Sequence, residues 1–273
     1  MKRHSIIWCR FIFIYKFEKK FNTMKKLILF LAAGLLAITT FSSCKKKGCT
    51  DPSATNYNSK AKKDNGSCLY TPFIVVIGAS DTTINVGTTY SDPGATATNK
   101  DGSSVTVTTT GQVNSATVGD YEINYSATNA NGTSTAKRTV HVIVGLDNWI
   151  ANWVVSSDCG AAFPLNSAPT ISINGTNALT IDGMFSISIP SIPLILPNGL
   201  TIASGGTANA TVNGATITVP NQSYDAGGIG TITYSGTGTM NATGTEFTIT
   251  YTYNNDLPAI GGSGQCTATY TKQ

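Results

Sequence analysis

The feature that most constrains the fold is a pattern of short alternating segments. In stretches such as "DYEINYSATNANG" (120–132) and "GGIGTITYSGTGT" (227–239), apolar and polar residues alternate, and Asn-Gly or Gly-Gly pairs lie at the ends. A period of two places every second side chain on one face of a strand, and Asn-Gly favours a tight hairpin. Almost nothing after residue 71 has helical periodicity. The chain is therefore predicted to be all-β.

A secretory leader is predicted from Met24. Two lysines precede an apolar run (27–41) that is shorter than the roughly 20 residues of a membrane-spanning helix. Ser42-Ser43-Cys44 follows this run and resembles a bacterial lipobox, in which the cysteine is lipidated and becomes the first mature residue. The resemblance implies that Cys44 is the lipidation site and that residues 1–43, an upstream extension followed by the signal peptide, are removed.

The lipid anchor implies a location at the outer membrane. Related lipoproteins that reach the cell surface carry acidic residues just after the lipidated cysteine. Here Lys45, Lys46 and Lys47 stand in those positions. The periplasmic leaflet is therefore expected in preference to the cell surface.

Removal of the leader reverses the sign of the net charge. The full chain has 18 basic and 14 acidic residues, of which residues 1–43 hold eight and one. The remaining 10 basic and 13 acidic residues give the mature chain a net charge of −3. Nucleic-acid binding is therefore not expected, because it requires a basic surface.

The mature chain divides into three predicted parts: residues 44–70, 71–144 and 145–273. Four cysteines remain after Cys44, an even number in an oxidising compartment, and they allow three pairings. The pairing that respects the three parts is Cys49–Cys68 and Cys159–Cys266. Zinc is not expected, because the mature chain has a single histidine and no C-x-x-C motif.

The first part, 44–70, is too short to bury a core, so a disulfide must stabilise it. Its sequence "CTDPSATNYNSKAKKDNGSC" resembles a small Cys-bracketed module of secreted and surface proteins in Gram-negative bacteria. Asp51, Asn56 and Asp64 carry oxygen atoms of the kind that bind Ca²⁺. The alternative is that these side chains cap turns. Calcium is the one possible cofactor, and no other is expected.

The second part, 71–144, has about seven short predicted strands, the number in a small sandwich. It contains "GTTYSDPGA" (87–95), "VGDYEINYSATNANG" (118–132) and "RTVHV" (138–142) in that order. These blocks resemble a bacterial immunoglobulin-like family that occurs as spacer domains in surface proteins and in an insecticidal crystal toxin. The resemblance implies an immunoglobulin-like sandwich with a role in presentation or adhesion.

The third part, 145–273, is predicted to be an antiparallel β-barrel, with a second β-sandwich as the alternative. Strands are expected at residues 149–155, 170–174, 178–189, 200–203, 207–212, 215–220, 229–235, 245–253 and 265–271. The opening "GLDNWIANWVVSSDC" (145–159) resembles the first strand of lipocalin-like barrels. A bridge between Cys159 and Cys266 would join the first and last strands, as barrel closure requires.

No group of residues in the sequence supports catalysis. His141 lies in a predicted strand of the immunoglobulin-like part, where an exposed structural position explains it. Asp120 and Glu122 share one strand face, but adjacent carboxylates on an open sheet are more often solvated than paired for glycoside hydrolysis. The glycine-rich stretch 227–239 alternates as a strand and precedes no helix, so it does not predict a phosphate site. The protein is therefore predicted not to be an enzyme.

Two features are candidates for ligand binding. Trp149 and Trp153 are expected on one strand face, either as a platform for sugar stacking or, in preference, as part of the barrel core. The second is the apolar segment "FSISIPSIPLILPNGLTI" (185–202), which three prolines keep out of a central strand. It is expected to be a loop folded over the core, a lid at a barrel mouth, or a contact surface for a membrane or a partner. The candidate residues in this segment are Phe185, Ile192, Leu194 and Leu196.

The sequence therefore predicts a non-enzymatic envelope lipoprotein that presents a β-rich binding or adhesion domain on an immunoglobulin-like spacer. The alternatives are a lipocalin-like carrier of an apolar ligand and a carbohydrate-binding accessory lipoprotein. The expected partners are a membrane, reached through the lipid anchor, and a protein, glycan or lipid ligand whose identity the sequence leaves open.

Overall fold

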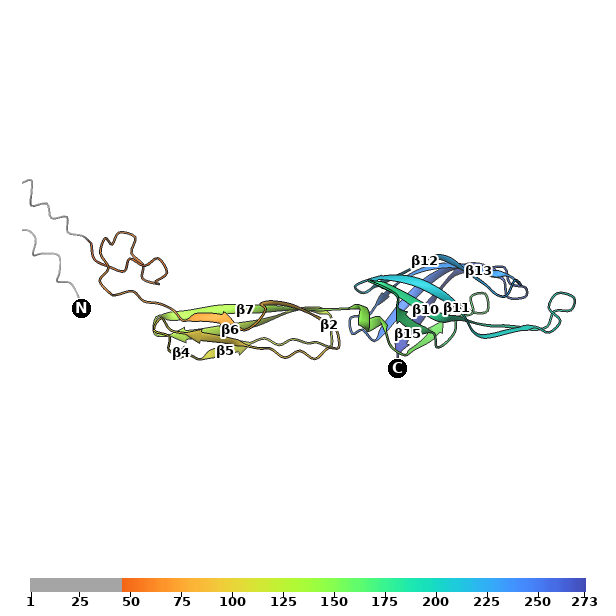
Figure 1. The fold of residues 1–273 in the computed structure, drawn as a ribbon, viewed down its shortest axis with the longest axis horizontal. Helices are drawn as coiled ribbons and strands as arrows, with labels where there is room; N and C mark the ends of the chain where they lie inside the picture. The colour runs from red at the N-terminus through yellow and green to blue at the C-terminus, as the bar shows by residue number, and fades with distance from the viewer. Residues whose placement is uncertain (1–45) are drawn as a thin grey trace, which may run out of the picture. The chain divides into compact units, whose positions relative to one another are not determined.

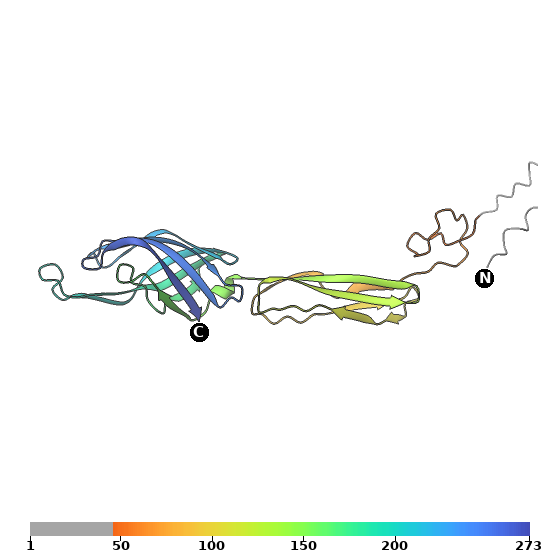
Figure 2. The ribbon, with the colours of Figure 1, turned by 180° about the vertical axis from the view of Figure 1, so that it is seen from behind.

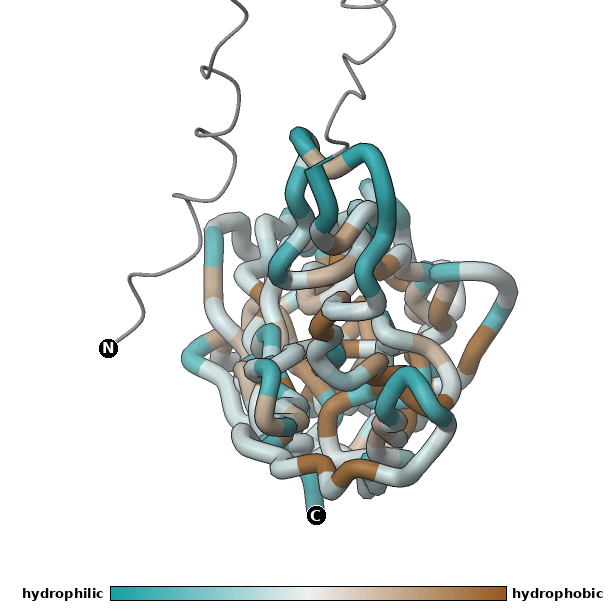
Figure 3. Tube along the Cα trace, turned by 90° about the vertical axis from the view of Figure 1, so that its left-hand side faces the viewer, coloured by the Kyte–Doolittle hydropathy of each residue, from teal (hydrophilic) through white to brown (hydrophobic). Residues whose placement is uncertain are grey.

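The computed structural model describes residues 46–273. The predictions for the leader and for Cys44 therefore lie outside the described residues. The chain divides into two compact units, one ending at Cys68 and one running from Leu69 to Gln273. Along the trace, single hydrophobic residues are separated by more polar ones, as expected for alternating strands (Figure 3).

Residues 73–143 form a two-sheet β-sandwich (Figure 1). The first sheet has the order β1 (Phe73–Val76), β3 (Ala95–Thr98), β4 (Ser104–Val105). The second has the order β2 (Asp81–Asn85), β7 (Gly132–Ile143), β6 (Gly119–Asn129), β5 (Val107–Thr110). β2 runs parallel to β7, and the remaining pairs are antiparallel. The prediction of about seven strands in a small sandwich is confirmed.

Alternating side chains of β6 and β7 build the core of the sandwich. Ile123, Tyr125 and Ala127 of β6 are buried, as are Val140 and Val142 of β7. Asn129 and Gly132 are paired at the ends of the two strands, so the Asn131-Gly132 hairpin lies where the sequence predicts it. A one-residue slip in this register would expose every one of these apolar side chains.

Residues 153–272 form one eight-stranded antiparallel sheet that is nearly closed into a barrel (Figures 1 and 2). The strands are β8 (Trp153–Ser157), β9 (Thr170–Ile173), β10 (Ala178–Ile189), β11 (Leu200–Asn213), β12 (Thr216–Asp225), β13 (Thr231–Met240), β14 (Glu246–Asn255) and β15 (Gly262–Lys272). Each strand from β9 to β15 pairs with the next, and β8 pairs with β15. A bridge between Asn152 and Thr170 and a 2.8 Å hydrogen bond from Val155 N to Ser167 O connect the two edges. The barrel prediction is confirmed over the sandwich alternative.

The disulfide between Cys159 and Cys266 joins the end of the edge strand β8 to its neighbour β15. Ser157 pairs with Ala268, so Cys159 just beyond β8 lies opposite Cys266 in β15. The predicted bridge therefore continues the β8–β15 ladder, and both cysteines are buried.

Several of the predicted strands differ in extent from those in the structure. Trp149 belongs to a 3₁₀ turn, η1 (Leu146–Trp149), and the first barrel strand begins only at Trp153. The segments 200–203 and 207–212 are a single strand, β11, that runs through Gly205 and Gly206. At Gly206 a Cβ atom would lie 2.8 Å from the ring of Phe185, so the glycine makes room for a core side chain without ending the strand.

Aromatic side chains fill the barrel interior. Phe247 packs against Trp149, Trp153 and Tyr270 at ring-centroid distances of 5.1, 4.8 and 4.3 Å. A second group of rings surrounds Phe163 and consists of Phe185, Tyr234, Tyr251 and Tyr253. The interior is thus a packed core, as expected for a small barrel.

Candidate functional site

The most exposed apolar feature is the turn between β10 and β11, residues 190–199, here called the hairpin tip. The end of this hairpin extends beyond the rest of the barrel in both views (Figures 1 and 2). Beyond Ser186, whose N–H donates to the carbonyl of Pro164, the two strands pair only with each other, at Ile187–Ile202, Ser188–Thr201 and Ile189–Leu200. The end of the segment therefore protrudes, whereas Ile192 and Leu196 pack against the apolar core, as expected of a loop over the core. A lid or a contact surface stays a prediction.

The backbone of the hairpin tip is held by its own hydrogen bonds. Ile192 and Leu196 exchange two bonds of 2.8 Å, and Ile195 N donates to the carbonyl of Ile192 at 3.1 Å. Gly199 N donates to the carbonyl of Leu196 at 3.0 Å. The prolines at positions 190, 193 and 197 have no N–H group to satisfy and restrict φ. The tip is therefore rigid and has few free backbone donors.

Leu194 lies at the centre of this turn in an unfavourable conformation. Its φ is +70°, in the left-handed region that glycine and asparagine adopt more readily than leucine. Its side chain is fully exposed, and that of the adjacent Ile195 is 68% exposed. A large apolar side chain in this exposed conformation is less stable than glycine would be, which makes the position a candidate for contact with a partner.

The hairpin tip also lies in a long uncharged part of the chain. No Asp, Glu, Lys, Arg or His occurs between Asp182 and Asp225, a stretch that covers the hairpin tip, β11 and the part of β10 that follows Asp182. Edges and tips of strands usually carry charges that keep them in water. This ribbon relies on its three prolines alone to block strand addition at the tip.

The other predicted binding residues lie elsewhere. Phe185 is buried in the core, and Ile192 and Leu196 are half-buried at the base of the turn. Trp149 and Trp153 are both buried, and Trp153 Nε1 donates to the carbonyl of Trp149 at 2.9 Å. Of the predicted ligand-binding residues, only Leu194 is fully exposed.

A buried group of tyrosine hydroxyls lies inside the barrel. The hydroxyls of Tyr251 and Tyr270 are 2.9 Å apart, and burial raises the pKa of Tyr270 to about 12. Burial also raises the pKa of Tyr234 to about 12. The Tyr234 hydroxyl has no hydrogen-bond partner among residues 46–273. All three groups are therefore neutral near pH 7.

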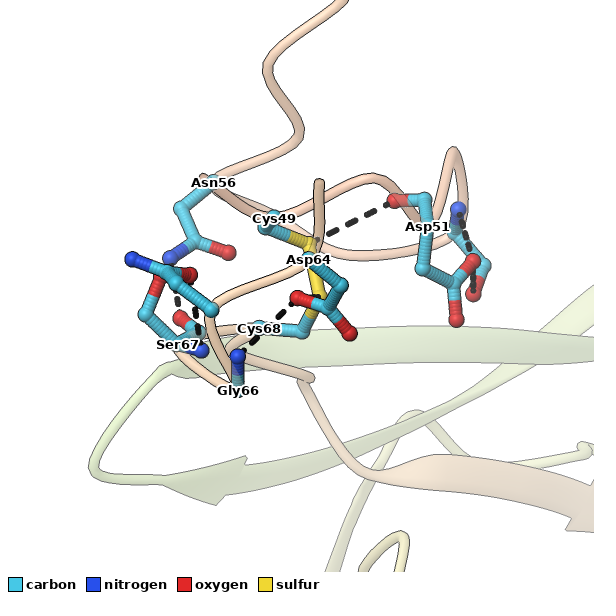
Figure 4. The surroundings of a disulfide bond; sticks show 9 residues. Cys49, Asp51, Asn56, Asp64, Gly66, Ser67 and Cys68 are labelled. Carbon is cyan, nitrogen blue, oxygen red and sulfur yellow. Dashed lines mark hydrogen bonds between the residues drawn. A yellow bond between two sulfur atoms is a disulfide. The ribbon is translucent and has the colours of Figure 1, made fainter. Parts of the chain in front are cut away.

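The disulfide module, residues 46–68, contains the predicted bridge between Cys49 and Cys68 (Figure 4). Asp51 Oδ1 accepts hydrogen bonds from the backbone and hydroxyl of Ser53, and Asp64 Oδ1 accepts one from Gly66 N at 3.0 Å. Asn56 Nδ2 donates to the carbonyl of Ser67. Asp51 and Asn56 lie on opposite sides of the bridge (Figure 4). These contacts are those of turn-capping side chains, and calcium binding stays a prediction.

Three exposed acidic residues of the sandwich, Asp81, Asp120 and Glu122, pair with basic side chains of β7. His141 Nδ1 lies 2.6 Å from Asp120 Oδ1, and His141 Nε2 lies 3.4 Å from the carboxylate of Asp81. Glu122 pairs with Lys137. Asp120 and Glu122 thus each pair with a basic side chain of β7, and the His141 pair is ionic when the imidazole is protonated. Hydrogen bonds from the His141 ring to the carboxylate of Asp120, and to a lesser extent to that of Asp81, raise the pKa of His141.

One cluster of metal-binding residue types occurs within residues 46–273, namely Asp158, Cys159 and Cys266. Its two cysteines form the barrel disulfide, so their sulfur atoms are not free to bind a metal. In the same part of the chain, none of the helices has the length and apolar character needed to cross a bilayer.

Sequence reasoning missed two features of these sites. Ile195 is not among the predicted binding residues, although it is exposed beside Leu194. The Pro-x-x-Pro-x-x-x-Pro spacing was the available signal, because such spacing favours a short rigid turn. The tyrosine group has no local signal, since Tyr234, Tyr251 and Tyr270 come from three different strands.

Comparison with known proteins assigns the sandwich to a family. Residues 74–142 match the family model described as bacterial surface protein, Ig-like domain. This part of the chain is therefore a bacterial surface-protein immunoglobulin-like domain, which confirms the resemblance seen in the sequence.

Two solved structures are similar to this chain at low TM-scores. A lipoprotein from Bacteroides thetaiotaomicron has a TM-score of 0.27 and 14% identity, over 74% of this chain and 100% of that one. The CBM51-2 and INT domains of ZmpB from Clostridium perfringens have a TM-score of 0.21 and 13% identity, over 70% of this chain and 42% of that one. No curated protein matches the sequence.

Proposed function

We propose that this chain is a non-enzymatic envelope lipoprotein in which the immunoglobulin-like domain is a spacer and the barrel is the binding or adhesion domain. The observation that carries the proposal is the hairpin tip, where Leu194 is fully exposed in a strained conformation. A protruding apolar tip on a packed barrel suits contact with another surface. The membership of residues 74–142 in a surface-protein family supports a spacer role.

Because the barrel interior is packed, its contents also favour contact through the outside of the barrel, at the hairpin tip, over a ligand held inside. Rings such as Phe163, Phe247 and Tyr270 occupy the positions that a carrier would leave open. The pair Trp149 and Trp153 is buried, so neither ring offers a face to a sugar. The His141 pairs are exposed ion pairs on a sheet surface, which suits a structural role better than a catalytic one.

The anchor and its location are part of the proposal. Cys44 is lipidated and the protein lies in the periplasmic leaflet of the outer membrane. Metabolic labelling with a palmitate analogue should label the wild type and fail to label Cys44→Ser. Protease treatment of intact cells should leave the protein uncut, and its removal by the protease would place it on the cell surface instead.

The binding role is tested by a photoreactive amino acid placed at Leu194 in cells. We expect an adduct with an envelope component that disappears in Ile195→Ser. The same amino acid at Thr252, an exposed position in the middle of the barrel sheet, is the matched control. An adduct that forms equally at both positions would remove the proposed role of the tip.

A second candidate, the apolar-ligand carrier, is favoured by one observation. The buried Tyr234 hydroxyl lacks a partner within residues 46–273, and a buried unpaired hydroxyl costs about 1–3 kcal/mol. A ligand with a carbonyl or carboxylate group would satisfy it. Equilibrium dialysis with long-chain fatty acids tests this candidate, and binding lost in Tyr234→Phe would support it over the presentation role.

A further inference from the structure

We propose that the hairpin tip inserts into a lipid bilayer other than the one that carries the lipid anchor. The proposal rests on the proposed function and names the surface that the binding domain contacts. It involves Leu194 and Ile195 as the inserted side chains, and the ribbon of β10 and β11 as their support.

The exposed side chains have the chemistry of an inserted tip. Leu194 and Ile195 are adjacent and both project into solvent, so both can leave water together when the tip meets hydrocarbon. Burial of apolar side chains is the main favourable contribution to such contacts. The flanking prolines restrict the turn, so little conformational entropy is lost on insertion.

The backbone of the tip is also suited to an apolar medium. In hydrocarbon, every N–H and C=O group needs an internal partner. Ile192 and Leu196 satisfy each other, and Ile195 and Gly199 donate within the turn. The three prolines remove three further donors. The N–H of Leu194 is not among the bonded groups, so water or a lipid headgroup must satisfy it when the tip inserts.

The absence of charge favours a bilayer over a protein partner. Protein interfaces generally use charged and polar groups for specificity. The stretch between Asp182 and Asp225 has no charged residue, which is what entry into a low-dielectric medium requires. A bilayer needs no shape complementarity from the two inserted side chains.

The backbone conformation of Leu194 also supports insertion of the hairpin tip. Glycine or asparagine at this φ of +70° would relieve strain and shield the turn from aggregation. A leucine at this position is explained if its side chain inserts into the bilayer. A single tip binds weakly, but many anchored copies on one surface act together, which raises the effective affinity.

The second bilayer is assigned because a complete immunoglobulin-like domain separates the anchor position from the barrel along the chain. A spacer is useful for reaching a surface other than the one of attachment. The two bilayers have the same chemistry, so the experiment must tell them apart.

The test uses the full lipidated chain in vesicles of phosphatidylethanolamine and phosphatidylglycerol. An environment-sensitive fluorophore is attached to Ser191→Cys, an exposed tip position that leaves Leu194 and Ile195 intact. Thr252→Cys on the barrel wall is the matched control. Nitroxide-labelled acyl chains are placed either in the vesicles that carry the protein or in a second population.

We expect quenching at Ser191→Cys only when the nitroxide is in the second population, and none at Thr252→Cys. Quenching by the protein's own vesicles would overturn the assignment to a second bilayer. No quenching from either would overturn insertion. A fluorescence change that grows with the number of protein molecules per vesicle, in the absence of the second vesicles, would show that the tip contacts another copy of the protein. That result would also overturn insertion. Flotation of the same samples measures whether the lipid anchor holds the protein on its own vesicles. A failure of the anchor is therefore distinguished from a failure of the tip to insert.

Variants of the tip provide a second measurement. Leu194→Asn keeps a residue that tolerates positive φ and removes the apolar side chain, so vesicle bridging should fall by about tenfold or more. Leu194→Met keeps the apolar side chain and should bridge like the wild type. Equal bridging by all three proteins would contradict the proposal.

Discussion

Arg138 Nε donates a hydrogen bond of 3.0 Å to Asp92 Oδ1, although 46 residues separate the two in sequence. Arg138 is almost completely buried in the sandwich. Its guanidinium also donates to the carbonyls of Ala79 and Ile77, and Tyr125 Oη donates to Asp92 at 2.7 Å. Arg138 therefore connects β7 to residues 77–79, which precede β2, and to Asp92, which follows it.

Loss of this cation should destabilise the immunoglobulin-like domain. Arg138→Ala leaves Asp92 without its buried partner, and breaking such a pair costs about 3–5 kcal/mol. Hydrogen exchange of β6 and β7 amides should accelerate strongly while the barrel amides stay protected. The neighbouring Lys137→Ala is the control, because its exposed pair with Glu122 contributes about 1 kcal/mol or less. Equal effects of both variants would contradict the role of the network.

The His141 ion pairs predict a pH dependence of stability. Hydrogen bonds from the His141 ring to the carboxylates of Asp120 and Asp81 raise the folded-state pKa of His141 above its ordinary value of 6.5. The stabilising contribution is therefore complete below about pH 6.5 and is lost as the pH rises through the raised pKa. The melting temperature of the domain should fall over this window, and His141→Gln should remove that slope. An NMR titration with an unshifted midpoint would refute the prediction.

Reduction of the barrel disulfide should destabilise the barrel alone. The bridge spans 107 residues, and closing a loop of this size contributes up to about 4.7 kcal/mol on the chain-entropy view. A reductant should lower the thermal transition followed by tryptophan emission and leave the immunoglobulin-like domain unchanged, since that domain has no cysteine. A Cys159→Ser/Cys266→Ser variant should match the reduced wild type. Mass mapping that joined Cys68 to a barrel cysteine would contradict the prediction.

The fluorescence emission of Trp149 and Trp153 should be that of buried tryptophans shielded from water. Trp149 and Trp153 are the only tryptophans after residue 43, and both pack against Phe247 in the barrel core. Emission should be blue-shifted, resist iodide, and stay unchanged when oligosaccharides are added, because neither ring faces solvent. Iodide quenching that a polysaccharide reversed would instead support the carbohydrate-binding alternative.

The strand content of both β-domains could be predicted from the sequence because alternation is local. The expected strand at 178–189 agrees with β10 at both ends, and Asn131-Gly132 marks the hairpin of β6 and β7. The strand ends near Trp149 and Gly205 could not be predicted in the same way. Whether a glycine interrupts a strand depends on what packs against it, and at Gly206 that neighbour is Phe185.

By itself the sequence determined the all-β class, the immunoglobulin-like family and the two disulfide partners. These follow from periodicity, turn residues and cysteine placement, which are properties of neighbouring residues. Only the tertiary structure decided that the edges β8 and β9 nearly close the sheet, that Arg138 lies buried beside Asp92, and that Leu194 projects into solvent. Burial and strand pairing depend on contacts between segments that are distant in sequence. The sequence of an apolar run that contains prolines is therefore compatible both with a loop over the core and with a turn that extends from it.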